Sequence, residues 1–153
     1  MRIVIQRVLS ASVDIAGIRK SHIDQGLLIL VGICNDDTDD DIDYLCQKVV
    51  NMRIFDDENG VMNNPVTTVA DSGILVVSQF TLMASTRKGN RPSYIHASKP
   101  DFAVPMYEKF VAKLQSLYGK EIQTGTFGAD MQVSLVNDGP VTIIMDSKQR
   151  DRF

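Results

Sequence analysis

Two short apolar runs set the strongest limit on how this chain folds. The first spans Gly26 to Ile33, and the second spans Gly73 to Leu82 and becomes polar towards its end. Continuous apolar runs of this length, rich in Val, Ile and Leu, are typical of strands buried on both faces of a sheet. Such strands need a covering layer on each side. Neither run reaches the ~20 apolar residues that a membrane span needs.

The remaining segments predict more strand than helix. Apolar residues recur at helical spacing after a helix start at Thr38 or Asp39, and again from roughly Pro100 to Tyr118. A chain of 153 residues fits one domain with an adequate core. The pattern predicts a β-rich α/β domain over residues 1–146, followed by a charged, frayed tail over residues 147–153. Further strands are expected at Arg2 to Ile15, Ile54 to Phe55, Glu121 to Phe127, Met131 to Val136 and Val141 to Met145.

The chain is poor in the side chains that usually carry out catalysis. It has two histidines, His22 and His96, and two cysteines, Cys34 and Cys46. No Ser-His-Asp set, P-loop, dinucleotide fingerprint or HExxH motif is present. The acidic run before the first helix lacks EF-hand spacing, so we interpret it as a charged helix start. We therefore expect no cofactor and no metal. The N-terminal pattern lacks a signal peptide's apolar core, which predicts a cytoplasmic protein.

The net charge of −3 conceals two oppositely charged segments. Residues 35–60 carry nine acidic and two basic side chains, whereas residues 84–120 carry seven basic and two acidic ones. The basic segment includes Arg87, Lys88 and Arg91, and a basic loop beside a polar strand end is suited to binding phosphates. A solvated face that balances the acidic segment explains the same pattern equally well.

Two polar segments stand next to predicted strands. Ser78-Gln79-Phe80-Thr81 ends the second apolar run, and strand ends in α/β sheets often hold ligands. Backbone N–H groups and hydroxyls there are able to stabilise an oxyanion. Asn137-Asp138-Gly139-Pro140 precedes the last strand and consists of turn-forming residues. Taken alone, the first segment is more typical of a strand that meets its loop, and the second is typical of a tight turn.

Taken together, these segments resemble the D-aminoacyl-tRNA deacylase family. The likeness rests on Ser78 to Leu82, Gly89 to Ser93, Thr124 to Met131 and Asn137 to Thr142. Shorter matches occur at Gln6 to Val8, Ala11 to Val13 and Arg53 to Phe55, so the resemblance covers the chain to about Met145. It implies layered sheets that form a barrel-like core with two outer helices. It also implies a homodimer that hydrolyses the ester of D-aminoacyl-tRNA, and of glycyl-tRNA mischarged on alanine tRNA.

The resemblance also assigns roles to residues. Ser78, Gln79, Phe80 and Thr81 are expected to line the aminoacyl pocket. A cis Gly139-Pro140 peptide is expected to enter the pocket of the other subunit and to reject L-amino acids. Supporting positions are also implied: Arg7 bracing the dipeptide across the dimer, Asn137 beside it, and Met131 and Phe127 as walls.

The resemblance favours catalysis without a protein nucleophile. In that mechanism the terminal ribose 2′-OH of the tRNA assists water, and backbone N–H groups around Phe80 hold the carbonyl. Thr81 is the obvious nucleophile candidate, but no base is evident beside it. Two alternatives remain open at this point. One is a non-catalytic dimer that binds nucleic acid through the basic loop, and the other is a general esterase that depends on Thr81.

Overall fold

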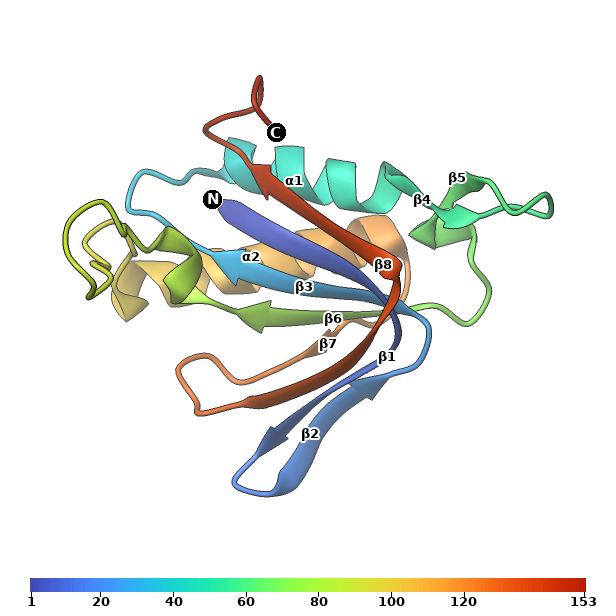
Figure 1. Cartoon of the computed structure of the whole chain (residues 1–153), viewed down its shortest axis with the longest axis horizontal. Helices are drawn as coiled ribbons and strands as arrows, with labels where there is room; N and C mark the ends of the chain where they lie inside the picture. The colour runs from blue at the N-terminus through green and yellow to red at the C-terminus, as the bar shows by residue number, and fades with distance from the viewer.

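The chain folds into eight strands and two α-helices, with two short 3-10 turns. The computed structural model describes all 153 residues (Figure 1). This composition confirms the predicted β-rich α/β fold, in which a nearly closed, barrel-like sheet carries two helices. The elements are β1 (Arg2–Ile15), β2 (Ile18–Ile23), β3 (Gly26–Gly32), α1 (Asp39–Asn51), β4 (Arg53–Asp56), β5 (Met62–Pro65), η1 (Val66–Thr68), β6 (Gly73–Ser78), η2 (Phe80–Met83), α2 (Pro100–Tyr118), β7 (Gln123–Thr124) and β8 (Gln132–Asp146).

The long first strand organises the main sheet. The order of the sheet is β2-β1-β3-β6-β7, and β8 pairs with β1 as well. The first half of β1 pairs with β3 and its second half pairs with β2, while β8 runs antiparallel along nearly all of it. β3 and β6 are parallel. The sheet curls so that β2 also contacts β6 and β7, which produces the barrel-like shape visible below the helices in Figure 1.

Side chains of β3 and β6 are buried on both faces of the sheet, as their apolar runs predict. Leu27, Ile29 and Ile74 belong to the larger core, which packs under α1 and α2. Leu28 and Leu75 point the opposite way, into a smaller core inside the curled sheet. This alternation follows from the period of two along a strand. The sheet is thus covered by helices on one face and by its own curled strands on the other.

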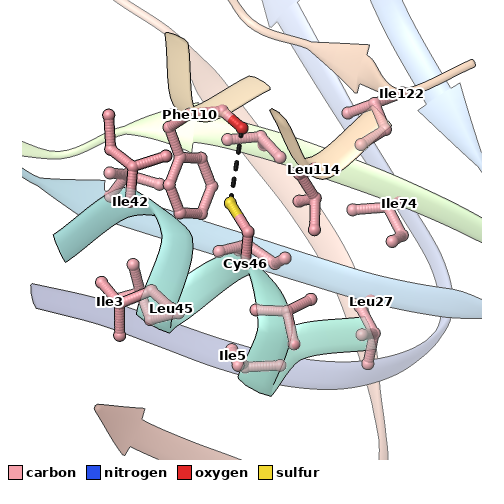
Figure 2. Close-up of a cluster of buried hydrophobic side chains, with 14 of the residues drawn as sticks. Ile3, Ile5, Leu27, Ile42, Leu45, Cys46, Ile74, Phe110, Leu114 and Ile122 are labelled. Atoms are coloured by element: carbon pink, nitrogen blue, oxygen red, sulfur yellow. Dashed lines mark hydrogen bonds between the residues drawn. The ribbon is translucent and has the colours of Figure 1, made fainter. Parts of the chain in front are cut away.

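The two helices also pack against each other over the larger core. Figure 2 shows Cys46 pointing from α1 towards α2, where its Sγ lies 3.6 Å from the carbonyl oxygen of Phe110. Both residues are fully buried. Burial raises the pKa of the Cys46 thiol to about 12, so it remains protonated at neutral pH. Cys46 is therefore a packing residue.

The C-terminal tail is bound rather than frayed. Lys148 Nζ donates to the Asp41 carboxylate at 2.8 Å, and Arg150 pairs with Asp40 at 2.6 Å and stacks over the ring of Tyr44. The acidic start of α1 provides the attraction that holds these basic side chains. For residues 147–150 the expected fraying is wrong, because the acidic segment, distant in sequence, lies beside them.

Several predicted boundaries move for local reasons. The second apolar run leaves the sheet at Ser78, and η2 takes up its last residues. The two strands expected between residues 131 and 145 are one strand, β8, with an irregularity opposite Arg7. The strand expected over 121–127 shrinks to two residues. No helix combines the length and the apolar character that crossing a membrane requires.

Candidate functional site

A pocket of about 610 Å³ opens where β6 ends. Three segments line it: the end of β6 with the start of η2, the loop that leads into α2, and the connection between β7 and β8. Five of the residues predicted for the site lie in this lining: Ser78, Gln79, Phe80, Phe127 and Met131. The fold therefore brings together two segments that are about 50 positions apart in sequence.

A close approach of backbones positions the η2 turn. The N–H of Gln79 donates to the carbonyl of Val31 at 2.7 Å, which extends the ladder between β3 and β6 by one bond. A Cβ at Gly32 would lie 2.9 Å from the Cβ of Leu82 and 3.1 Å from the carbonyl oxygen of Gln79. Only glycine at position 32 therefore allows η2 to pack this closely against the end of β3. The turn therefore holds Phe80 at the edge of the pocket.

Aromatic rings form two sides of the pocket. Phe80 is largely exposed and packs edge-on against Tyr94, with ring centroids 5.0 Å apart. Phe127 packs against Tyr107 of α2 at 5.9 Å. The hydroxyl of Tyr107 donates to the carbonyl of Val76 within β6, which fixes that wall to the strand. Exposed Phe80 therefore forms an apolar rim of the pocket, whereas Phe127 is linked to β6 through Tyr107.

The lining of the pocket contains no nucleophile paired with a base. No histidine or cysteine contributes to it, and its charged residues are Lys99 and Asp130. Thr81 lies outside the lining, although it was expected there. The turn of the backbone at Gln79 directs Thr81 outward, and the Gln79 amide donates to its hydroxyl at 2.5 Å. The arrangement suits polarisation of a carbonyl by backbone groups better than attack by a side chain.

The Asn137–Pro140 segment forms a bulge in β8 and not an isolated turn. Gln6 pairs with Thr142 and Val8 pairs with Asn137, so residues 138–141 stand opposite Arg7 alone. The peptide bond between Gly139 and Pro140 is cis, and both residues are exposed. Neither lines the pocket of its own chain. The bulge therefore presents its backbone outwards from the sheet.

Arg7 supports this bulge from inside the same chain. Its guanidinium is buried, donates to the carbonyl of Ile54 at 2.6 Å and lies 3.1 Å from the carboxylate of Asp138. The contact with Asp138 is an ion pair without hydrogen-bond geometry at Nε. A Cβ at Gly139 would lie 3.0 Å from the guanidinium. Within one chain Arg7 therefore contacts the bulge, and the bracing across a dimer stays a prediction.

Comparisons with known proteins show to which family the chain belongs. A family model described as D-Tyr-tRNA(Tyr) deacylase matches residues 4–146. The chain belongs to the D-aminoacyl-tRNA deacylase family. A relative named D-aminoacyl-tRNA deacylase from Flavobacterium johnsoniae is 63% identical over 151 residues, covering 99% of this chain and 100% of the relative. One of the same name from Bacteroides thetaiotaomicron is 62% identical over 152 residues, with 99% and 100% covered.

Solved structures show the same fold. One described as a c-Myc DNA unwinding element binding protein superposes with a TM-score of 0.89 at 39% identity, covering 95% of this chain and 98% of that one. Another, titled as a probable eukaryotic D-amino acid tRNA deacylase, has a TM-score of 0.80 at 16% identity, with 94% and 97% covered. The second likeness concerns the fold alone.

The basic loop of this deacylase-family chain lies apart from the pocket. Arg87, Lys88 and Arg91 are exposed at the tip of a loop that paired backbone bonds between Ser85 and Ser93 close. Of the three, only Arg87 contributes to a neighbouring groove, on the other side of η2. None of the three basic side chains therefore lines the pocket itself.

One group of possible metal ligands exists away from this pocket. Ligand atoms of Cys34, Asp36 and Asp37 lie within 4.8 Å of one another. Asp37 already accepts hydrogen bonds from the ammonium group of Met1 and from the N–H of Cys34. Burial raises the pKa of the Cys34 thiol, which disfavours the thiolate that a metal would need. These contacts account for the group as a structural one.

Three polar residues of the pocket were not predicted from the sequence as site residues: Ser98, Lys99 and Asp130. Ser98 and Lys99 lie directly before α2, in a segment with no motif, and Asp130 lies in the connection before β8. Their positions become meaningful only when these loops meet beside Ser78. The single available signal was that Asp130 falls inside the family-like segment from Thr124 to Met131.

Proposed function

We propose that this protein hydrolyses the ester bond that joins a D-amino acid to the 3′ end of tRNA. The observation that carries the proposal is the pocket beside Ser78 and Phe80, which combines backbone donors with apolar walls and has no nucleophile–base pair. When the ribose of the substrate supplies the hydroxyl that relays the proton, the protein needs to supply only the position of the ester and the donors for its oxyanion. Membership of the deacylase family supports the same reaction.

In the proposed mechanism the ester carbonyl points at the start of η2. The first N–H groups of a helical turn have no partner within that turn, so those of Phe80 and its neighbour are suited to hold a developing oxyanion. Water attacks the carbonyl carbon and the bond to the ribose 3′-oxygen breaks. The neighbouring 2′-hydroxyl relays a proton to the departing oxygen. The products are free tRNA and the free amino acid.

Selection against L-amino acids is assigned to the Gly139-Pro140 bulge of a second copy of the chain. In a homodimer the bulge of one protomer would enter the pocket of its partner, and its backbone carbonyls would accept hydrogen bonds from the substrate's α-amino group. An L side chain would then collide with the main chain, whereas a D side chain would point outward. The exposed bulge supports this arrangement, as do the exposed apolar residues Leu9, Val136 and Ile144 on β1 and β8.

The same selection extends the substrate range to glycyl-tRNA. Glycine has no side chain, so it escapes a filter that acts by steric exclusion. Glycine mischarged on alanine tRNA is therefore included among the proposed substrates. We assign the activity to residues 1–146, with Arg87, Lys88 and Arg91 contacting the tRNA backbone.

The decisive experiment compares D-tyrosyl-tRNA with L-tyrosyl-tRNA under identical conditions. Purified protein is expected to release D-tyrosine at least about 100-fold faster than the uncatalysed rate, since a positioned site with oxyanion donors contributes this much or more. The L-ester is expected to decay at its uncatalysed rate. Equal decay of both esters with and without protein would rule out the enzyme.

A second candidate is a dimer that binds nucleic acid without cleaving it. The structural neighbour described as a DNA unwinding element binding protein and the exposed basic loop favour it. It predicts retention of tRNA or DNA with the ester intact. A general esterase that depends on Thr81 is disfavoured because that hydroxyl lies outside the pocket and its only side-chain partner is an amide. Cleavage of small esters without tRNA, lost in Thr81→Ala, would revive it.

A further inference from the structure

The hydroxyl of Ser98 is an unpaired polar group at the deacylase pocket. Ser98 lies in the loop before α2, and its backbone N–H donates to the carbonyl of Ile33 at 2.9 Å. Its Oγ is buried but has no protein hydrogen-bond partner. The only other buried side-chain atoms in this condition are Arg7 Nε and Ser21 Oγ. Buried hydroxyls nearly always have a partner, so Ser98 is suited to bind a polar atom that enters from the pocket.

A small cavity, which Ser98 also lines, adjoins the pocket. Its volume is about 20 Å³, and five residues line both it and the large pocket: Ser78, Gln79, Phe80, Ser98 and Phe127. A cavity of about 10–15 Å³ by this measure is enough for one water molecule, provided that polar groups line it. It is too small for an amino-acid side chain. Its position places one water-sized site between Ser98 and the start of η2.

From this arrangement we infer that Ser98 is the positioning residue for the water that attacks the ester. The inference rests on the proposed deacylase function. Ser98 Oγ accepts a hydrogen bond from the water, which directs an oxygen lone pair towards a carbonyl held at Phe80. A C–O bond forms from the water to the carbonyl carbon, and the bond to the 3′-oxygen breaks. One water proton reaches that oxygen through the ribose 2′-hydroxyl, and the other leaves when the new carboxylic acid ionises. Ser98 itself is unchanged.

The test measures turnover of D-tyrosyl-tRNA by Ser98→Ala. Misplacing a reacting group by about 1 Å can cost about 100-fold, so we expect kcat to fall about 10- to 100-fold while KM stays within about twofold. The matched control is Ser21→Ala, which removes the other unpaired buried hydroxyl, on β2, and should leave kcat and KM unchanged. A kcat for Ser98→Ala within about twofold of the wild type would overturn the inference.

A competing nucleophile separates positioning of water from a general structural effect. Hydroxylamine also attacks the ester and yields a hydroxamate, which is counted against free tyrosine after subtraction of the enzyme-free reaction. Loss of the water site should raise the ratio of hydroxamate to tyrosine about tenfold in Ser98→Ala, since only the water depends on Ser98. An unchanged ratio with a lowered rate would mean that Ser98 supports the pocket without positioning water.

A crystal structure of the wild-type protein provides a measurement that does not depend on activity. We expect ordered water within hydrogen-bonding distance of Ser98 Oγ, and its loss in Ser98→Ala. A Ser98 hydroxyl paired with a protein atom would overturn the inference, even if Ser98→Ala failed to fold. Failure of the proposed function is distinguishable, because the wild type itself would then leave D-tyrosyl-tRNA intact.

Discussion

The side-chain amide of Asn137 donates a hydrogen bond of 2.9 Å to the backbone carbonyl of Arg7. A second bond, of 3.0 Å, runs from the same amide to the carbonyl of Val141. Asn137 therefore closes the base of the Gly139-Pro140 bulge and ties it to β1. The bulge is held by this amide on one side and by the Arg7 guanidinium on the other. Contacts within the chain thus fix the conformation of the outward-facing backbone of the bulge.

Gly139→Ala should disrupt the conformation of the Gly139-Pro140 bulge. Gly139 has a φ of +119°, and a Cβ there would lie 2.9 Å from Val141 Cγ2 and 3.0 Å from the Arg7 guanidinium. We expect a loss of about 1–3 kcal/mol in the free energy of unfolding and at least about a 100-fold loss in kcat/KM for D-tyrosyl-tRNA. Gly17→Ala is the control, since Gly17 also has positive φ but its Cβ would meet nothing within 4 Å. It should show strain without loss of activity.

Arg7→Met should loosen the bulge by removing its charged support. The substitution leaves the carbonyl of Ile54 and the carboxylate of Asp138 without their partner. Because Asp138 is partly exposed, we expect a cost of about 1–2 kcal/mol, below that for a fully buried pair. Urea denaturation measures the stability, and deacylation of D- and L-tyrosyl-tRNA measures selectivity. A variant with unchanged stability and unchanged selectivity would contradict a supporting role for Arg7.

Thr81→Ala should retain most of the turnover. The Thr81 hydroxyl contacts the Gln79 amide and lies outside the pocket, so its loss should lower kcat by less than about tenfold. Single-turnover deacylation of D-tyrosyl-tRNA provides the measurement. Near-complete loss of activity, with folding and tRNA binding intact, would contradict this expectation and revive the nucleophile model.

Asp41 should make the stability of the fold sensitive to acid. Burial alone would raise the pKa of this carboxyl, but hydrogen bonds from Lys148, Ser147 and Thr38 lower it well below its usual value. The carboxylate therefore stabilises the fold above the unfolded-state pKa of about 3.9, and this contribution is lost as the pH falls below that value. Asp41→Asn should cost about 1–3 kcal/mol at pH 7, and the difference from wild type should shrink towards pH 2.

The control for Asp41 is Asp43→Asn. Asp43 pairs with Lys113 at 2.8 Å, but both side chains are exposed. Removing an exposed pair should change the free energy of unfolding far less than removing the buried Asp41 carboxylate. Thermal unfolding across the pH range separates the two variants, and equal losses at neutral pH would show that burial of Asp41 does not matter.

Arg87→Ala and Arg91→Ala should weaken tRNA binding without changing chiral selection. Both side chains are exposed on the basic loop and lie outside the pocket. Each phosphate contact that is lost should reduce the slope of log Kd against log salt by about 0.7–0.9. Filter binding at several salt concentrations measures the slope. Slopes equal to that of the wild type would place the tRNA elsewhere.

The sequence by itself determined the layers of this fold. Gly26 to Ile33 and the first part of the run from Gly73 are apolar at every position, so they had to lie in a sheet covered on both faces. The start of α1 was also predictable, because Thr38 and the following aspartates are a local capping signal. Such features depend on interactions between residues that are close in sequence. They can therefore be predicted from short stretches of the chain.

Only the tertiary structure decided which residues meet. Asn137 reaches Arg7 across 130 positions because the register between β1 and β8 places them side by side. Ser98 becomes an unpaired hydroxyl at a cavity only when the loop before α2 meets the end of β6. The contact between the tail and α1 is also tertiary, since Lys148 bonds Asp41, which is distant in sequence. Contacts of this kind depend on strand register and chain packing, which no short pattern of residues encodes.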